Sequence, residues 1–183
     1  MGFHTFDVSR ADRLEDESRY RYVSVDELLA LFDPLGGVVA DLGSGTGFYT
    51  DDVAPYVERA YAVDVQPEMH GYYRSKGAPE NVEFVTAEVS DLPFADGSLD
   101  AAFSTMTFHE FASEAALTEV ARTLTEGGRL GVADWSARGL GDAGPPMDER
   151  YDLSDAVEMV EEAGLTVEHG DERRETFVVR ASR

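Results

Sequence analysis

The chain has 183 residues, enough for one compact domain with a sizeable core and too few for two full-sized domains. Its 37 acidic residues outnumber the 15 basic ones, giving a formal net charge of −22, and it contains no cysteine. This composition excludes disulfide frameworks, thiolate nucleophiles and cysteine-held metals, and it disfavours a nucleic-acid partner, because nucleic-acid binders usually carry a basic patch.

The acidic residues are spread along almost the whole chain, the only lysine is Lys76, and isoleucine does not occur. This bias resembles proteins of halophilic archaea, in which self-repulsion of the folded state is screened by salt. The N-terminus has no basic stretch followed by an apolar one, so we expect a cytoplasmic location. No apolar run approaches the length of a membrane span.

A polar segment from Arg10 to Arg21 precedes Val25–Phe32, whose leucines suit a short amphipathic helix. From Val38 onward, short apolar runs alternate with amphipathic segments, which is typical of βαβ units and predicts a mostly parallel sheet. We therefore expect residues 1–37 to form a helical extension or lid and residues 38–183 to form the main domain.

The expected strands are Val38–Leu42, Ala60–Val65, Val82–Thr86, Ala101–Thr105, Arg129–Asp134, Thr166–His169 and Phe177–Arg180. The expected helices are Gly47–Tyr56, Pro67–Arg74, Glu114–Leu124 and Ser154–Glu162. Ser154 is the expected cap of the last helix and Gly164 its stop.

The sharpest motif follows the first strand, where Gly43, Gly45 and Gly47 form a Gly-x-Gly-x-Gly turn before a helix. Glycines allow the sharp turn and a close approach of a ligand to the backbone, and a helix N-terminus supplies free N–H groups. The second strand ends in Asp64, whose carboxylate can accept both hydroxyls of a ribose. These features fit NAD and S-adenosylmethionine equally.

The choice between the two cofactors depends on the stretch Leu92-Pro-Phe-Ala-Asp-Gly-Ser-Leu-Asp100. Together with the glycine turn and Asp64, it resembles the class I S-adenosylmethionine-dependent methyltransferases, in particular their small-molecule, type 11-like branch. A dinucleotide fold would carry Gly-x-Gly-x-x-Gly instead. The resemblance implies a Rossmann-like sheet of seven strands, with the last strand antiparallel and helices on both faces.

The resemblance also implies which residues bind S-adenosylmethionine, whose product is S-adenosylhomocysteine. Asp41 would lie near its amino group, the backbone at Gly43, Ser44 and Gly45 against its amino-acid part, and Asp64 at the ribose, with Gly47 as a further cofactor-binding candidate. Val65 and Met69 would pack near the adenine, Glu88 and Val89 would hydrogen-bond it, and Thr105 is a further cofactor-binding candidate. The family more often has aspartate at the position of Glu88.

The acceptor site is expected at the ends of the fourth and fifth strands. His109 is the candidate general base, because an imidazole titrates near neutral pH, and Glu110 can orient it or bind a substrate amine. Asp134 and Trp135 end the fifth strand at the same edge. The N-terminal segment is a candidate lid, with His4, Phe6, Arg10, Tyr20 and Tyr22, and the loop 141–150 can border the pocket. The histidines show no metal-ligand spacing.

The favoured hypothesis is an enzyme that methylates a small molecule. An RNA- or protein-methylating relative is the alternative among enzymes, although the chain lacks a basic patch and an Asn-Pro-Pro-Tyr-like motif after the fourth strand. A non-catalytic S-adenosylmethionine-binding module is the alternative of a different class.

Overall fold

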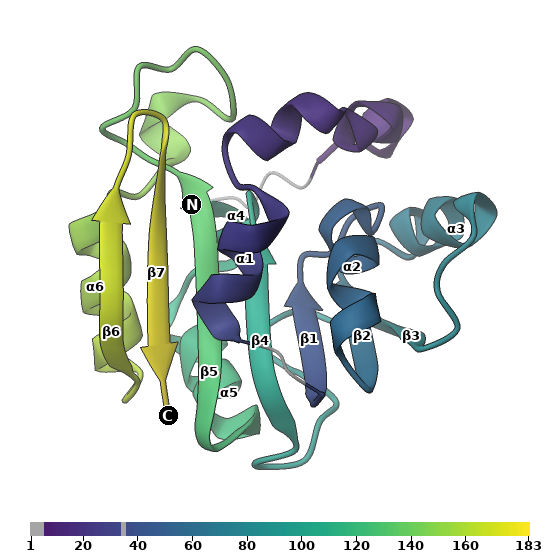
Figure 1. Cartoon of the computed structure of the whole chain (residues 1–183). Coiled ribbons are helices and arrows are strands. Elements are labelled where there is room, and N and C mark those ends of the chain that lie inside the picture. The colour runs from purple at the N-terminus through teal and green to yellow at the C-terminus, as the bar shows by residue number, and fades with distance from the viewer. Residues whose placement is uncertain (1–5, 34–35) are drawn as a thin grey trace.

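A computed structural model describes residues 6–33 and 36–183, so His4 of the expected lid lies outside the described residues. The structure contains a seven-stranded sheet with the order β3-β2-β1-β4-β5-β7-β6 (Figure 1). The strands are β1 Val38–Leu42, β2 Arg59–Asp64, β3 Val82–Thr86, β4 Leu99–Thr105, β5 Leu124–Trp135, β6 Thr166–Glu172 and β7 Thr176–Ser182.

Strands β1 to β5 pair in parallel, whereas β7 is antiparallel to both of its neighbours, β5 and β6. The predicted fold class, a mostly parallel sheet with an antiparallel last strand, is therefore confirmed. The chain reverses its strand order between β1 and β4, which is where ligands of open α/β sheets bind, beyond the carboxyl ends of the strands.

The α-helices are α1 Val25–Phe32, α2 Phe48–Val53, α3 Pro67–Lys76, α4 Phe108–Phe111, α5 Glu114–Thr123 and α6 Leu153–Glu162. The 3₁₀ helices are η1 Val8–Glu15, η2 Glu17–Arg21, η3 Ala54–Tyr56 and η4 Met147–Glu149. Among the described residues, 6–33 and 36–183, no helix has the length and apolar character needed to cross a membrane.

Helix α6 begins earlier than the sequence predicted. Its N-cap is Asp152, which accepts a hydrogen bond from Asp155 N at 3.0 Å, while the Asp155 side chain accepts one from Asp152 N. The expected cap, Ser154, lies inside the first turn and donates to Asp152 instead. A carboxylate with this reciprocal partner satisfies two free N–H groups at once, which a lone serine cannot do.

Two apolar clusters form the core, one on each face of the sheet. One cluster gathers α4, α5 and α6 and includes Leu117, Val120 and Phe177. The other gathers α1, α2 and α3 and includes Phe32 and Phe103, whose rings stack at 4.8 Å. Burial on both faces explains why the central strands are mostly apolar, which is the pattern that predicted them from the sequence.

The N-terminal segment, residues 6–22, crosses the carboxyl ends of the central strands (Figure 1). It is tied down at several points: Tyr20 Oη donates to Asp52 at 2.8 Å, Tyr72 Oη donates to Asp12 at 2.8 Å, and Lys76 pairs with Glu15 at 2.9 Å. Residues 6–22 therefore cover the glycine turn after β1, although they lie far from it in the sequence.

Candidate functional site

A cavity of about 1190 Å³ lies between the N-terminal segment and the carboxyl edge of the sheet. Its wall comes from the glycine turn, the ends of β2, β4 and β5, the loop after β3, and the loop after β5. Nine of the expected cofactor residues line it: Gly43, Ser44, Gly45, Asp64, Val65, Met69, Glu88, Val89 and Thr105. His109 and Glu110 line the same cavity.

Gly43 and Gly47 are required by packing. Both have φ of 78°, a left-handed conformation that favours glycine. A Cβ atom on Gly43 would lie 2.3 Å from the Thr107 side chain, and one on Gly47 would lie 2.1 Å from the Tyr73 ring. Gly47 caps α2 without lining the cavity, so its contribution to the site is the shape of the turn.

Gly45 faces the cavity. A Cβ atom there would meet only the Leu14 side chain of the N-terminal segment, at 3.4 Å. Beside it, the hydroxyl oxygens of Ser44 and Thr46 are buried and have no hydrogen-bond partner among the residues that the structure describes. An open glycine face with two free hydroxyls fits a polar ligand lying against this turn.

Asp64 is held at the end of β2 by two backbone donors. Gly45 N and Gln66 N each donate to its carboxylate at 2.8 Å. Burial raises the pKa of Asp64, and the two N–H groups lower it only in part. The carboxylate oxygens are thus fixed at the cavity wall, and each keeps a lone pair that can accept a ribose hydroxyl.

The residues expected around an adenine form a half-open wall. Met69 is buried and Val89 nearly so, while Val65 is 45% exposed although it lines the cavity. Glu88 is exposed at the rim. An exposed valine beside buried apolar side chains fits a flat apolar ring that would cover it.

Asp41 lies behind this wall instead of lining it. It is buried, and Thr50 Oγ1 donates to its Oδ2 at 2.6 Å. Burial raises the pKa of Asp41 to about 7. Its other oxygen has no hydrogen-bond partner in residues 6–33 and 36–183, so this carboxyl group is held in an unfavourable environment close to the glycine turn.

The acceptor end is organised by His109 and Asp134. Helix α4 begins directly after β4, with Phe108 fixed in the core and His109 facing the cavity. His109 Nδ1 lies 2.9 Å from Oδ2 of Asp134, which is buried at the end of β5 and also accepts from the N–H groups of His109 and Trp135. The carboxylate therefore keeps the proton on Nδ1 and leaves Nε2 free to accept one.

The charge of Asp134 also determines the pKa of His109. Burial has the largest single effect and lowers this pKa, but the charge and the hydrogen bond of Asp134, with the charges of Glu110 and Glu149, raise it, and the net pKa lies above 6.5. Glu110 Oε1 is 3.9 Å from Nε2, and burial raises the pKa of Glu110 to about 7. The sequence had singled out both residues, but not the pairing of His109 with Asp134.

The remaining expected residues divide between the cavity and its supports. Phe6, Arg10, Tyr22 and Trp135 line the cavity, and the rings of Tyr22 and Trp135 meet edge-on at 4.6 Å. Tyr20 does not line it and instead anchors the N-terminal segment. From the loop 141–150, residues 143–146 and 149 reach the cavity.

Arg19 is a cavity residue that the sequence did not reveal. Its Nη1 donates to the carbonyl of Leu14 at 2.6 Å, and its guanidinium lies 4.9 Å from the Phe48 ring and 5.1 Å from the Tyr49 ring. Within the described part of the chain no carboxylate forms an ion pair with it. A half-buried arginine without an ion pair beside the glycine turn favours an anionic ligand group.

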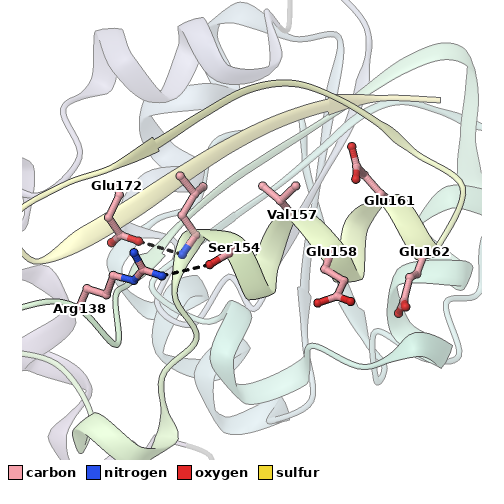
Figure 2. Close-up of a pocket in the computed structure, with 8 residues that line it drawn as sticks. Arg138, Ser154, Val157, Glu158, Glu161, Glu162 and Glu172 are labelled. Atoms are coloured by element: carbon pink, nitrogen blue, oxygen red, sulfur yellow. Dashed lines mark hydrogen bonds between the residues drawn. The ribbon is translucent and has the colours of Figure 1, made fainter.

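A second hollow, of about 680 Å³, lies along α6, away from this cavity (Figure 2). The polar groups at one end bind one another: Arg138 Nη2 donates to Ser154 at 3.3 Å, and Leu153 N donates to Glu172 at 3.0 Å. At the other end stand exposed carboxylates, Glu158, Glu161 and Glu162. None of the expected cofactor or acceptor residues lines this surface, so the cavity below the N-terminal segment is the candidate site.

Known proteins match both the fold and the motifs. A family model described as "Methyltransferase domain" matches residues 40–132, just over half of the chain. The crystal structure of a SAM-dependent methyltransferase from Aquifex aeolicus superposes with a TM-score of 0.88 at 30% identity, covering 97% of this chain and 99% of that one. The chain belongs to this methyltransferase family. Membership confirms the enzyme class and the cofactor, S-adenosylmethionine, that the sequence predicted.

Two curated relatives differ in their names. An uncharacterized methyltransferase-like protein of Schizosaccharomyces pombe is 35% identical over 102 residues, which are 55% of this chain and 39% of that protein. The dimethylglycine N-methyltransferase of Parasynechococcus marenigrum is 31% identical over 171 residues, which are 85% of this chain and 61% of that protein. The chain thus spans about two fifths of the length of the first relative.

Proposed function

We propose that this chain transfers a methyl group from S-adenosylmethionine to a small-molecule acceptor, with His109 as general base. One observation carries the proposal: the His109–Asp134 pair opens into the same cavity as the glycine turn and Asp64. A cofactor site and a poised base in one cavity are the two parts that such a transfer needs.

The described residues fit the cofactor along its length. Asp64 would accept the ribose hydroxyls, and Val65, Met69 and Val89 would pack against the adenine near Glu88. Gly45 would admit the amino-acid part against the backbone, and Arg19 would pair with its carboxylate. Asp41 does not line the cavity, so it would act on the amino group of the cofactor only through its charge.

When bound, S-adenosylmethionine supplies a methyl group on a positively charged sulfur, a good leaving group, so the transfer needs little further activation. The task of the protein is to hold the acceptor in line and to remove its proton. His109 Nε2 would take that proton, and Asp134 would stabilise the imidazolium that forms.

We also propose that residues 1–37 act as a lid on a main domain formed by residues 38–183. The segment contributes Leu14, Arg19 and Tyr22 to the cavity, and Gln66 Nε2 donates to the Phe6 carbonyl at 3.0 Å. A cover of this kind would exclude water from the reacting groups.

The composition supports a proposal about the salt concentration and the compartment in which the protein works. We propose a halophilic, cytoplasmic protein, because a net charge of −22 on 183 residues repels itself in dilute buffer, whereas at 1 M salt the screening length falls to about 3 Å. A small acceptor is favoured over RNA, since repulsion from phosphates opposes RNA binding.

Incubation with methyl-labelled S-adenosylmethionine and a pooled metabolite extract, in molar salt, tests the function. We expect a labelled small-molecule product with the native chain and at least about 100-fold less with His109→Gln. Binding of S-adenosylhomocysteine with no labelled product from any extract would favour a non-catalytic binding module. Label found only in added RNA or protein would favour the other enzyme classes.

A further inference from the structure

The acceptor end of the cavity is lined by carboxylates. Glu110 on α4 and Glu149 in the loop after β5 both line it, and Asp134 lies behind His109. Cationic side chains also line the cavity, namely Arg10, Arg13, Arg19 and Arg21. Arg150 is occupied by the carbonyls of Ala143, Pro145 and Ser136, and Arg21 is exposed with its guanidinium 4.6 Å from the Tyr22 ring.

The electrostatics of this end favour a cation. Burial is the main cause that raises the pKa of Glu110 to about 7; His109 lowers it, and the charges of Asp134, Asp64 and Glu149 raise it further. A positively charged group beside Glu110 would relieve this repulsion, whereas a carboxylate or phosphate on the acceptor would add to it.

The aromatic side chains agree with this preference. Tyr22 and Trp135 both line the cavity and contact each other at 4.6 Å between ring centroids. Each ring already has a guanidinium over it, Arg21 at 4.6 Å from the Tyr22 centroid and Arg150 at 5.6 Å from the Trp135 centroid, so the faces of these rings attract cations.

We infer that the methyl acceptor is a primary or secondary amine, which enters as the ammonium ion between Glu110 and Glu149 and gives its proton to His109. This inference rests on the proposed function. His109 Nε2 takes one N–H proton, and the freed nitrogen lone pair forms a bond to the methyl carbon while the C–S bond breaks. The electron pair of the C–S bond stays on sulfur. The products are the N-methylammonium ion and S-adenosylhomocysteine, and His109 then releases the proton to water.

Chemical blocking of amines tests the inference. A pooled metabolite extract is treated with formaldehyde and cyanoborohydride, which convert primary and secondary amines to tertiary amines and leave hydroxyl and carboxyl groups intact. The native chain is then assayed with labelled S-adenosylmethionine. We expect the labelled product to fall at least about tenfold relative to mock-treated extract. Undiminished label would overturn the amine and leave the proposed function standing; no label from either extract would contradict both.

A matched pair of variants supplies the second readout. Glu110→Gln removes the carboxylate at the acceptor end, and Glu161→Gln removes an exposed one on α6 (Figure 2). With the cation fraction of the extract as acceptor, we expect the apparent KM to rise about tenfold in Glu110→Gln only, with unchanged affinity for S-adenosylhomocysteine. An unchanged KM in a variant that still binds S-adenosylhomocysteine would overturn the inference.

Discussion

His109 Nδ1 lies 2.9 Å from Asp134 Oδ2, so a buried carboxylate at the end of β5 holds the imidazole that follows β4. The side chain of Asp134 is 1% exposed and that of His109 8% exposed, which leaves only the Nε2 side of the ring toward the cavity. This relationship explains how a histidine on a four-residue helix is kept in one orientation.

His109→Gln is expected to lower kcat at least about 100-fold, because glutamine cannot accept the proton. In the native chain kcat should rise with pH, since only neutral His109 is a base, and the midpoint should lie above 6.5 because Asp134 raises the pKa of His109. Steady-state rates from pH 5.5 to 9, at saturating acceptor, check this. A profile that is the same in the variant and in the native chain would exclude His109 as the base.

Asp134→Asn should move the midpoint of the residual activity to lower pH. Without the carboxylate, burial is the main remaining cause acting on the pKa of His109, and burial lowers it. The rate should also fall, because an amide fixes the proton on Nδ1 less well. Measurement of the His109 pKa by NMR titration separates the two effects, and a pKa that stays above 6.5 in this variant would contradict the explanation.

Arg19→Gln should weaken S-adenosylhomocysteine binding about tenfold or more, because it removes the cation proposed to pair with the cofactor carboxylate. It should leave the affinity for 5′-methylthioadenosine unchanged, since that nucleoside has no amino-acid part. Calorimetry on both ligands checks this, with Arg59→Gln, at the opposite end of the sheet, as control. Equal loss for both ligands would indicate a structural role.

Asp41→Asn should stabilise the ligand-free chain at high pH. The pKa of Asp41 is about 7 in the folded state and ordinarily 3.8, so between these values only the unfolded chain loses the proton. The free energy of unfolding therefore falls as the pH rises from about 4 to about 7. The variant should have the higher Tm at pH 8, with the gap closing toward pH 4, while the exposed Asp91→Asn should show none of this. A gap independent of pH would contradict the assignment.

Much of the fold could be predicted because its signals are local. The mostly apolar run of β1, the glycines at 43, 45 and 47, and the acidic end of β2 each lie within a few residues. The ends of the elements were harder to predict. The N-cap of α6 is Asp152 and not Ser154, because Asp152 forms a capping box with Asp155. Helix α4 is too short for a periodic pattern, so its residues were seen only as a segment after a strand.

The contacts that organise the site could not be predicted in the same way. Asp134 is 25 residues from His109 in the sequence, and the two meet only because β4 and β5 are neighbours in the sheet. Arg19 reaches the cavity because the whole N-terminal segment folds over the strand ends. Neither the contact between His109 and Asp134 nor the position of Arg19 in the cavity has a signature in residue spacing, because both depend on the completed sheet.

The most direct measurement is calorimetric titration of the native chain, in molar salt, with S-adenosylhomocysteine and, separately, with NADH. Asp64→Asn serves as the matched variant. We predict saturable binding of S-adenosylhomocysteine, about tenfold weaker in Asp64→Asn, and no binding of NADH. Binding of NADH without binding of S-adenosylhomocysteine would contradict the assignment of this cavity to methyl transfer.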